Sequence, residues 1–402
     1  MISLKGIIMG KKYFFCKTNK HPVEYKTGEK MIYELELRED GKKITCHTFS
    51  YTIERDFEEK IEGTASGESG TITIETVMNK PGFARVICRA LDENGNKLED
   101  CDDFEGGTGA EVETLRTTTP RPEKFDEFWE SCRKELYSVD VETIGYKEIE
   151  KPEHPDFNIY DVKIKCAGPM PVSGYITAPK KEGKYPAYVC YKGYGVVSAP
   201  ISCQEDKIIF YINAHGIENG RPDEYYQKLA QTRLKRYGLE KEQNLQPETS
   251  YFKYMAIRAA QAARFLLTLP NFNGELILYG GSQGAFQATV ASTLVPEVKL
   301  LDIFIPWLCD INAASIGRLR YGDPEYTYGM QFYDLTNLAS KIHCPVKLMA
   351  GLGDYTCHPA GIFSFYNAIP TKKQMRVIQN KIHLYQSPEA EEFKVNYPVY
   401  ND

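Results

Sequence analysis

The stretch Ile277-Leu-Tyr-Gly-Gly-Ser-Gln-Gly-Ala-Phe-Gln-Ala-Thr-Val-Ala291 decides the fold class of this chain. An apolar run over residues 276–279 leads into Ser282 between glycines, and helix-forming sequence follows. A strand that turns into a helix over one residue strains Ser282 and brings backbone close to Gly280 and Gly284, where a side chain would clash. The pattern predicts a nucleophile elbow at the carboxyl end of a sheet, rather than an ordinary Gly/Ser turn.

Composition excludes several classes of function. The chain has 402 residues and a net charge of −6, so it lacks the basic surface of a nucleic-acid-binding protein. No apolar run is long enough for a membrane span, and residues 1–12 lack the pattern of a signal peptide. The 11 cysteines, an odd number without Cys-x-x-Cys pairs, indicate buried thiols in a reducing compartment. We therefore expect a cytoplasmic protein that binds neither nucleic acid nor membranes.

The chain divides into two predicted domains, residues 1–112 and residues 113–402. In the first, residues 30–38, 71–77 and 83–91 alternate apolar and polar side chains, which predicts strands of an accessory β-sandwich. A proline-containing linker at 117–122 and an amphipathic helix over residues 125–136 follow.

Beyond residue 158, strand and helix patterns alternate, which predicts an α/β-hydrolase fold. The later strands are apolar throughout, so both faces of the sheet are expected to be covered. Polar residues 218–250 are predicted to form a part-helical insertion over the active-site side. The strands are expected at 159–166, 172–178, 187–191, 208–212, 276–279, 300–305, 346–350 and 375–378, and the helices at 251–267, 284–294, 335–342 and 359–369.

A nucleophilic serine needs a base and an acid, which follow it in the order Ser, Asp, His in α/β-hydrolases. Asp354 ends the strand at 346–350 in a Gly-bracketed turn, and His383 lies in a loop after the last strand. We therefore predict a triad of Ser282, Asp354 and His383, with Asp310 as the alternative acid. His215 and His358 fit less well, because His215 precedes the serine and His358 shares a loop with Asp354.

Acyl transfer also needs donors for the developing oxyanion. The backbone N–H of Gln283, directly after the serine, is one predicted donor. The second is the N–H of Tyr194, in the Lys192-Gly-Tyr-Gly195 loop after the strand at 187–191. This set of groups needs neither a metal nor a cofactor.

These motifs together resemble the acetyl xylan esterase / cephalosporin C deacetylase family, carbohydrate esterase family seven, over roughly residues 120–390. The resemblance implies serine-dependent removal of acetyl groups from sugar hydroxyls without a metal, a small acyl pocket, and often a ring-like homo-oligomer. The segments that carry it are Pro122-Glu-Lys-Phe-Asp-Glu-Phe-Trp129, Lys192-Gly-Tyr194, Tyr251-Phe-Lys-Tyr254, Gly280-Gly-Ser-Gln-Gly284 and Gly351-Leu-Gly-Asp-Tyr-Thr-Cys-His-Pro359.

The chain departs from the family pattern near the pocket. His215 and Ile217 stand where the family has arginine and glutamine, and Leu384 replaces the glutamate after the histidine. Lys192 and Ala285 replace a histidine and a glycine. His215 either acts on substrate or fills the space of the arginine, and we favour the second. Two alternatives to an acetylated-carbohydrate esterase stay open: a serine peptidase-like hydrolase, and a binding module on a hydrolase scaffold.

Overall fold

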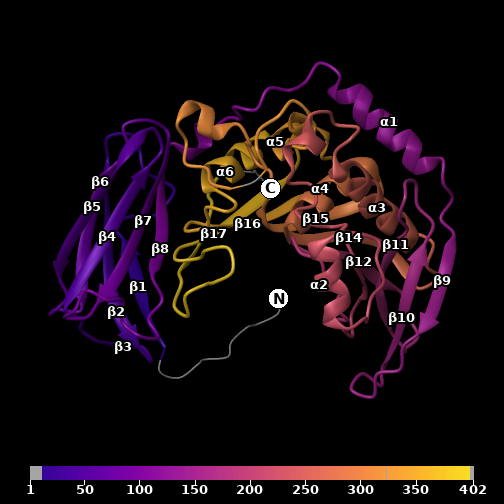
Figure 1. The fold of residues 1–402 in the computed structure, drawn as a ribbon, viewed down its shortest axis with the longest axis horizontal. Coiled ribbons are helices and arrows are strands. Elements are labelled where there is room, and N and C mark those ends of the chain that lie inside the picture. Colours follow the sequence, from indigo (N-terminus) through magenta and orange to yellow (C-terminus); the bar gives the residue numbers. More distant parts are fainter. Residues whose placement is uncertain (1–10, 323, 399–402) are drawn as a thin grey trace.

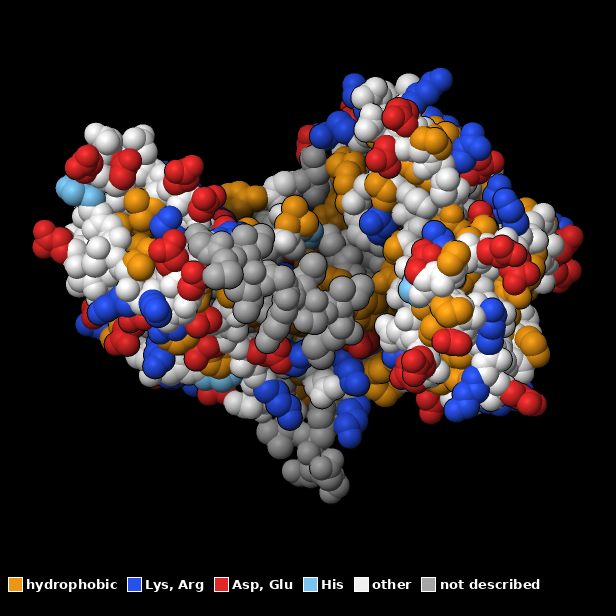
Figure 2. All heavy atoms as spheres, turned by 90° about the horizontal axis from the view of Figure 1, so that it is seen from below, with side chains coloured by type: hydrophobic (Ala, Val, Ile, Leu, Met, Phe, Trp, Pro, Cys, Tyr) orange, Lys and Arg blue, Asp and Glu red, His pale blue; other side chains and the backbone are white. Residues whose placement is uncertain are grey.

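The computed structural model describes residues 11–322 and 324–398. Most of the segment considered above for a signal peptide therefore lies outside the described residues. Among the described helices, none is both long and apolar enough to cross a membrane. On the face drawn in Figure 2, acidic and basic side chains are interspersed over two lobes with a notch between them.

Residues 12–110 form a β-sandwich of two four-stranded sheets, as predicted. One sheet has the order β1-β2-β3, with β6 paired to β2, and the other has the order β5-β4-β7-β8. Alternate side chains such as Leu35 and Val86 point into a common core. The strands are β1 (Lys12–Thr18), β2 (Lys30–Glu39), β3 (Lys42–Lys43), β4 (Thr48–Arg55), β5 (Glu58–Ser66), β6 (Thr71–Val77), β7 (Gly82–Leu91) and β8 (Phe104–Ala110).

The second part of the chain is built on a ten-stranded sheet with the order β18-β17-β16-β15-β14-β12-β13-β11-β10-β9. The six central strands, β17, β16, β15, β14, β12 and β13 in sheet order, are parallel to one another. Antiparallel strands close both edges. This confirms the predicted α/β architecture. The strands are β9 (Thr143–Glu148), β10 (Phe157–Ile164), β11 (Val172–Pro179), β12 (Tyr185–Tyr191), β13 (Ile208–Ile212), β14 (Phe272–Ser282), β15 (Val298–Pro306), β16 (Val346–Gly351), β17 (Lys373–Ile378) and β18 (Glu392–Lys394).

The helices are close to their predicted positions. They are α1 (Phe125–Tyr137), α2 (Asp223–Gln231), α3 (Tyr251–Leu266), α4 (Gln283–Leu294), α5 (Leu335–Leu338) and α6 (Pro359–Ala368), with short 3-10 turns at Val112–Thr114, Lys241–Asn244, Ala313–Ile316, Gly329–Phe332 and Ala339–Lys341. The helix expected over residues 335–342 is therefore a single α-turn that tightens into a 3-10 turn. The insertion at 218–250 is part-helical, as predicted.

Helices α1, α3, α4, α5 and α6 contact one another in series and cover one face of the sheet (Figure 1). Side chains on that face, such as Val189 and Leu278, are fully buried. Tyr188 and Tyr279 point the other way and are only half-buried. This face, which was expected to be covered, is less completely covered here than the helical face, although Cys190 and Ile277 on it are buried.

The β-sandwich packs beside β17 and α6, with the C-terminal loops between them (Figure 1). Phe83 of β7 lies 5.3 Å from Phe363 of α6, measured between ring centroids. Phe83 and Val112 thus join the core of the large sheet rather than that of the β-sandwich. The two parts share an apolar interface, so the sandwich can influence the loops at the carboxyl edge of the sheet.

Candidate active site

Ser282 lies at a strained turn between β14 and α4. Its φ of 54° and ψ of −123° are unusual for a residue with a side chain, as a nucleophile elbow requires. A Cβ on Gly280 would lie 2.5 Å from the Gly284 backbone, and one on Gly284 would lie 2.2 Å from the Tyr191 carbonyl oxygen. Both glycines are therefore required by close backbone approach, as the sequence predicts.

Asp354 lies in the turn after β16 with its carboxylate buried. Its Oδ1 accepts hydrogen bonds from the backbone N–H groups of Thr356, at 3.0 Å, and Cys357, at 2.9 Å. These two donors hold the carboxylate in one orientation. Its second oxygen, Oδ2, lies 2.9 Å from Nδ1 of His383.

His383 reaches Asp354 from the loop that follows β17. A carboxylate can only accept, so the imidazole Nδ1 carries the hydrogen of this bond. Nε2 is then the ring nitrogen with a free lone pair, the form that a general base needs. The structure thus brings the predicted acid and base into direct contact.

Cys357 belongs to the same cluster as this pair. Donor atoms of Asp354, Cys357 and His383 all lie within 4.8 Å of one another. Burial and the Asp354 carboxylate raise the pKa of the Cys357 thiol well above its ordinary value, although Ser282 opposes this shift. Asp354 links the cluster by accepting hydrogen bonds from the backbone N–H of Cys357 and from Nδ1 of His383.

The alternative acid Asp310 is committed elsewhere. Its buried carboxylate accepts the N–H of Thr118 at 2.7 Å and pairs with Arg318 at 2.9 Å. His358 caps α6, with Nδ1 accepting the N–H of Gly361 at 2.9 Å. Neither group is arranged as the partner of a base or a nucleophile.

The predicted oxyanion loop, residues 192–195, lies against the elbow. A Cβ on Gly193 would lie 4.0 Å from the Cβ of Ser282. The Tyr237 hydroxyl accepts the N–H of Gly195 at 2.8 Å and donates to Oε1 of Gln283 at 3.1 Å. Because Tyr237 belongs to the insertion at 218–250, that insertion reaches the active-site side, as predicted. One phenol therefore links the two segments expected to supply the oxyanion donors.

His215 supports the same loop from behind. It is buried, which lowers its pKa to about 4 and keeps the ring neutral. The Gly195 carbonyl, 3.0 Å from Nε2, can only accept, so Nε2 carries the hydrogen and Nδ1 accepts from the Tyr251 hydroxyl at 2.9 Å. Both ring nitrogens are occupied within the protein, which favours the space-filling interpretation of His215.

The model of the acetyl xylan esterase (AXE1) family matches residues 109–319 and 320–399 of the chain. The chain belongs to this family. It is a carboxylic-ester hydrolase with an α/β-hydrolase fold preceded by a β-sandwich. The family match includes Ser282, Asp354 and His383 and begins in the last strand of the β-sandwich.

A curated relative is the acetyl esterase Axe7A of Xylanibacter ruminicola, 27% identical over 377 residues, which covers 87% of this chain and 82% of the relative. The 87% of this chain that is matched is more than residues 109–402 alone could supply, so the similarity extends into the β-sandwich. Among solved structures, the acetyl xylan esterase of Paenibacillus sp. R4 covers 68% of this chain and 92% of its own, with a TM-score of 0.55 and 21% identity. Acetyl xylan esterase 1 of Thermoanaerobacterium sp. JW/SL YS485 has the same TM-score and identity, and covers 69% of this chain and 93% of its own. Both support the fold.

In this esterase the β-sandwich holds the loop that carries His383. The side-chain amide of Gln379 exchanges two hydrogen bonds with the backbone of Gly107, at 2.8 and 2.9 Å. Asn380 donates to the Phe14 carbonyl at 3.0 Å, and beyond His383 the Ser387 hydroxyl reaches the same carbonyl at 3.3 Å. The loop is thus fixed to the sandwich on both sides of the histidine.

The sequence reasoning missed Tyr237, Cys357 and the sandwich contacts of the esterase. Cys357 lies within the Gly351–Pro359 segment quoted above, so its position could have been noticed. Tyr237 lies in an insertion without a recognisable motif, and no local pattern marks it. Leu384, which replaces a family glutamate, is 95% exposed and makes no packing contribution that explains the replacement.

The Tyr237→Phe variant is expected to lower kcat by about tenfold with little change in KM. The variant loosens the backbone donors expected at Gln283 and Tyr194, and these donors stabilise the oxyanion of the transition state more than the bound ground state. The measurement is steady-state hydrolysis of 4-nitrophenyl acetate. Tyr185→Phe is the matched control, since it removes a hydroxyl bonded to the Lys181 carbonyl at the other end of β12. Equal kcat values for wild type and Tyr237→Phe would contradict this positioning role.

Proposed function

We propose that this esterase removes acetyl groups from acetylated carbohydrates through a triad of Ser282, His383 and Asp354. The observation that carries the proposal is the hydrogen bond between Asp354 and Nδ1 of His383, at 2.9 Å, beside a strained serine elbow. Nε2 of His383 takes the Ser282 proton as the hydroxyl oxygen attacks the acetyl carbonyl. His383 then returns the proton to the sugar oxygen that leaves, and water releases acetate from the acyl-enzyme.

Backbone donors stabilise the oxyanion in this mechanism. Gln283 is the first residue of α4, where N–H groups have no partner within the helix and the helix dipole favours negative charge. The N–H of Tyr194, in the loop against the elbow, is the second proposed donor. The bonds from Tyr237 to both segments keep the loop and the helix at a fixed separation, as a preorganised oxyanion site needs.

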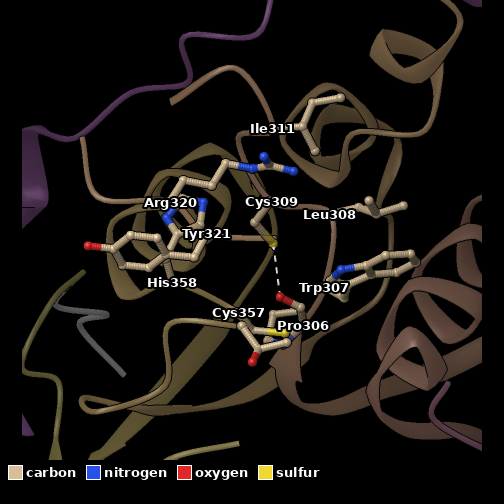
Figure 3. A pocket seen from close by; sticks show the side chains of 10 residues that line it. Pro306, Trp307, Leu308, Cys309, Ile311, Arg320, Tyr321, Cys357 and His358 are labelled. Carbon is tan, nitrogen blue, oxygen red and sulfur yellow. Dashed lines mark hydrogen bonds between the residues drawn. The ribbon is translucent and has the colours of Figure 1, made fainter. Parts of the chain in front are cut away.

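A small cavity beside the elbow favours an acetyl group. It measures about 10 Å³, close to the space that one water molecule needs (Figure 3). Its lining residues include Pro306, Trp307, Cys309 and Cys357. The backbone N–H of Trp307 donates to the Ser282 carbonyl at 3.3 Å, which places the cavity beside the elbow. A methyl group fits such a space, whereas a longer acyl chain would have to displace buried side chains.

The family assignment argues against both alternatives considered from the sequence. A carboxylic-ester hydrolase is an enzyme, which removes support from the binding-module hypothesis. The cavity and the loops described above show no feature that favours a peptide substrate. The relative Axe7A is an acetyl esterase by name, in agreement with the proposed reaction.

We expect kcat/KM to fall by about tenfold or more from 4-nitrophenyl acetate to the butyrate, and again to the octanoate, because each added methylene must displace the cavity wall. The test is initial-rate hydrolysis of the three esters at one pH, with the rate without enzyme subtracted. A kcat/KM that is equal or rises with chain length would contradict the acetyl assignment while leaving the esterase activity intact.

A further inference from the structure

A cleft of about 370 Å³ opens beside His383, between the β-sandwich and the loops of the large sheet. Such a volume is typical of a site for a small molecule. Arg85 of β7 and Glu105 of β8 form its sandwich side, Tyr321 lies on a loop after β15, and Tyr355 and His383 form the catalytic side. Nothing in the reaction as described so far uses the two sandwich residues.

The position of the cleft assigns it to the departing alcohol. Nδ1 of His383 is bonded to Asp354, so the proton for the leaving oxygen must come from the other ring nitrogen. His383 lines this cleft but not the small cavity beside Ser282. Tyr321 lines both spaces and therefore lies at their boundary. The acyl group and the alcohol thus have separate places on the two sides of the elbow.

The charges in the cleft favour a neutral alcohol. The Arg85 guanidinium pairs with Glu54 at 2.9 Å and also with Glu105, so two carboxylates balance one cation. It also lies 4.6 Å from the centre of the Tyr355 ring. An anionic alcohol would meet an excess of negative charge here, whereas hydroxyl groups can donate to the free lone pairs of Glu105.

Two tyrosines complete the wall. The Tyr321 side chain is 46% exposed, and its hydroxyl is bonded to Glu54 at 3.0 Å. This bond fixes the ring while leaving an apolar face open for the C–H face of a sugar ring. Tyr355 is almost completely buried, so its ring supports the wall while its hydroxyl, out of reach of the cleft, offers no group to a ligand.

From these observations we propose that this cleft binds the leaving alcohol as an uncharged pyranose, which stacks on Tyr321 and hydrogen-bonds to Glu105. The inference rests on the proposed function and adds the residues that contact the alcohol and select it by charge. It also gives the β-sandwich a part in substrate binding, through Glu105.

The test compares three acetate esters: ethyl acetate, whose alcohol is too small to fill the cleft, a mono-acetylated methyl xyloside, and a mono-acetylated methyl glucuronoside, which is anionic. Wild type is expected to prefer the xyloside over the glucuronoside by about tenfold or more in kcat/KM. For Tyr321→Ala, the fall in kcat/KM on the xyloside should exceed the fall on ethyl acetate by about tenfold, mainly through KM.

Two further variants separate binding from structure. Tyr321→Phe keeps the ring and should recover most of the xyloside activity lost in Tyr321→Ala. Glu105→Gln removes one negative charge and should raise glucuronoside turnover relative to xyloside turnover several-fold, an effect that loosened packing would not produce. Tyr146→Ala is the matched control, because Tyr146 is an exposed tyrosine on β9 that stacks on Tyr160.

Equal falls on ethyl acetate and the xyloside in Tyr321→Ala, or a wild-type preference for the glucuronoside, would overturn the inference. Hydrolysis of ethyl acetate without hydrolysis of either sugar ester would also overturn it but leave the esterase mechanism standing. Failure of wild type to hydrolyse any of the three esters would refute the proposed function itself, and the inference with it.

Discussion

The Ser282→Ala variant is expected to hydrolyse 4-nitrophenyl acetate with a kcat lower by about four to six orders of magnitude. In the proposed mechanism the hydroxyl oxygen forms the acyl-enzyme, so its removal abolishes that route. Cys357, which clusters with Asp354 and His383, is an alternative nucleophile, but burial raises the pKa of its thiol well above the ordinary value, so it is not ionised at neutral pH. A stopped assay at high enzyme concentration would measure the residual rate.

Alanine keeps the Cβ of serine, so the strained backbone of the elbow should be unaffected and the variant should fold. Thermal unfolding compared with wild type checks this directly. Ser138→Ala is a matched control, because Ser138 caps the far end of α1 and its hydroxyl donates to the Glu135 carbonyl at 2.8 Å. A fluorophosphonate should label wild type and Ser138→Ala but not Ser282→Ala. Labelling of Ser282→Ala at the wild-type rate would show that another residue is the nucleophile.

The Asp354→Asn variant is expected to lower kcat by about four orders of magnitude, as for other triads. Two backbone N–H groups point at Oδ1, so the oxygen of the new amide would take that place and its NH2 group would face His383. The imidazole would then have to accept at Nδ1 and carry its hydrogen on Nε2, a tautomer that cannot take the serine proton. The fold should be kept, because asparagine matches aspartate in shape.

Asp310→Asn separates the two candidate acids. Asp310 forms a buried pair with Arg318, so the variant should unfold at a lower temperature. The kcat of its folded fraction should stay within about threefold of wild type, because Asp310 does not bond to His383. A large loss of kcat in Asp310→Asn, with activity retained in Asp354→Asn, would exchange the two roles.

The elements that could be predicted are those that depend on local patterns. Strands such as Ile208–Ile212 and helices such as α3 agree with the sequence to within a few residues, because periodicity and capping act over one element. The half-covered face of the large sheet could not be predicted. An apolar run indicates that a strand is buried in the sheet, but it does not say which other segment covers each face of that sheet.

The sequence by itself determined the elbow and the position of the acid, because both follow from the pattern of one strand and the turn after it. Gly280 is needed for the close approach of Gly284 within the elbow, and Asp354 is placed by the end of its own strand. The approach of Gly284 to Tyr191 comes from the neighbouring strand β12. The order of serine, acid and histidine is the one expected for an α/β-hydrolase. The catalytic roles themselves stay predictions until the variants above are measured.

The sequence predicted His383 as the base, but only the tertiary structure brought it into contact with the acid and showed what the β-sandwich contacts. His383 and Asp354 are brought together by two loops on neighbouring strands, and Gln379 beside His383 is bonded to Gly107, 272 residues away. Contacts over such distances depend on how separate elements pack, and no local pattern encodes them. The cleft that joins Arg85 to His383 has the same origin, since its walls come from segments that only the folded chain brings together.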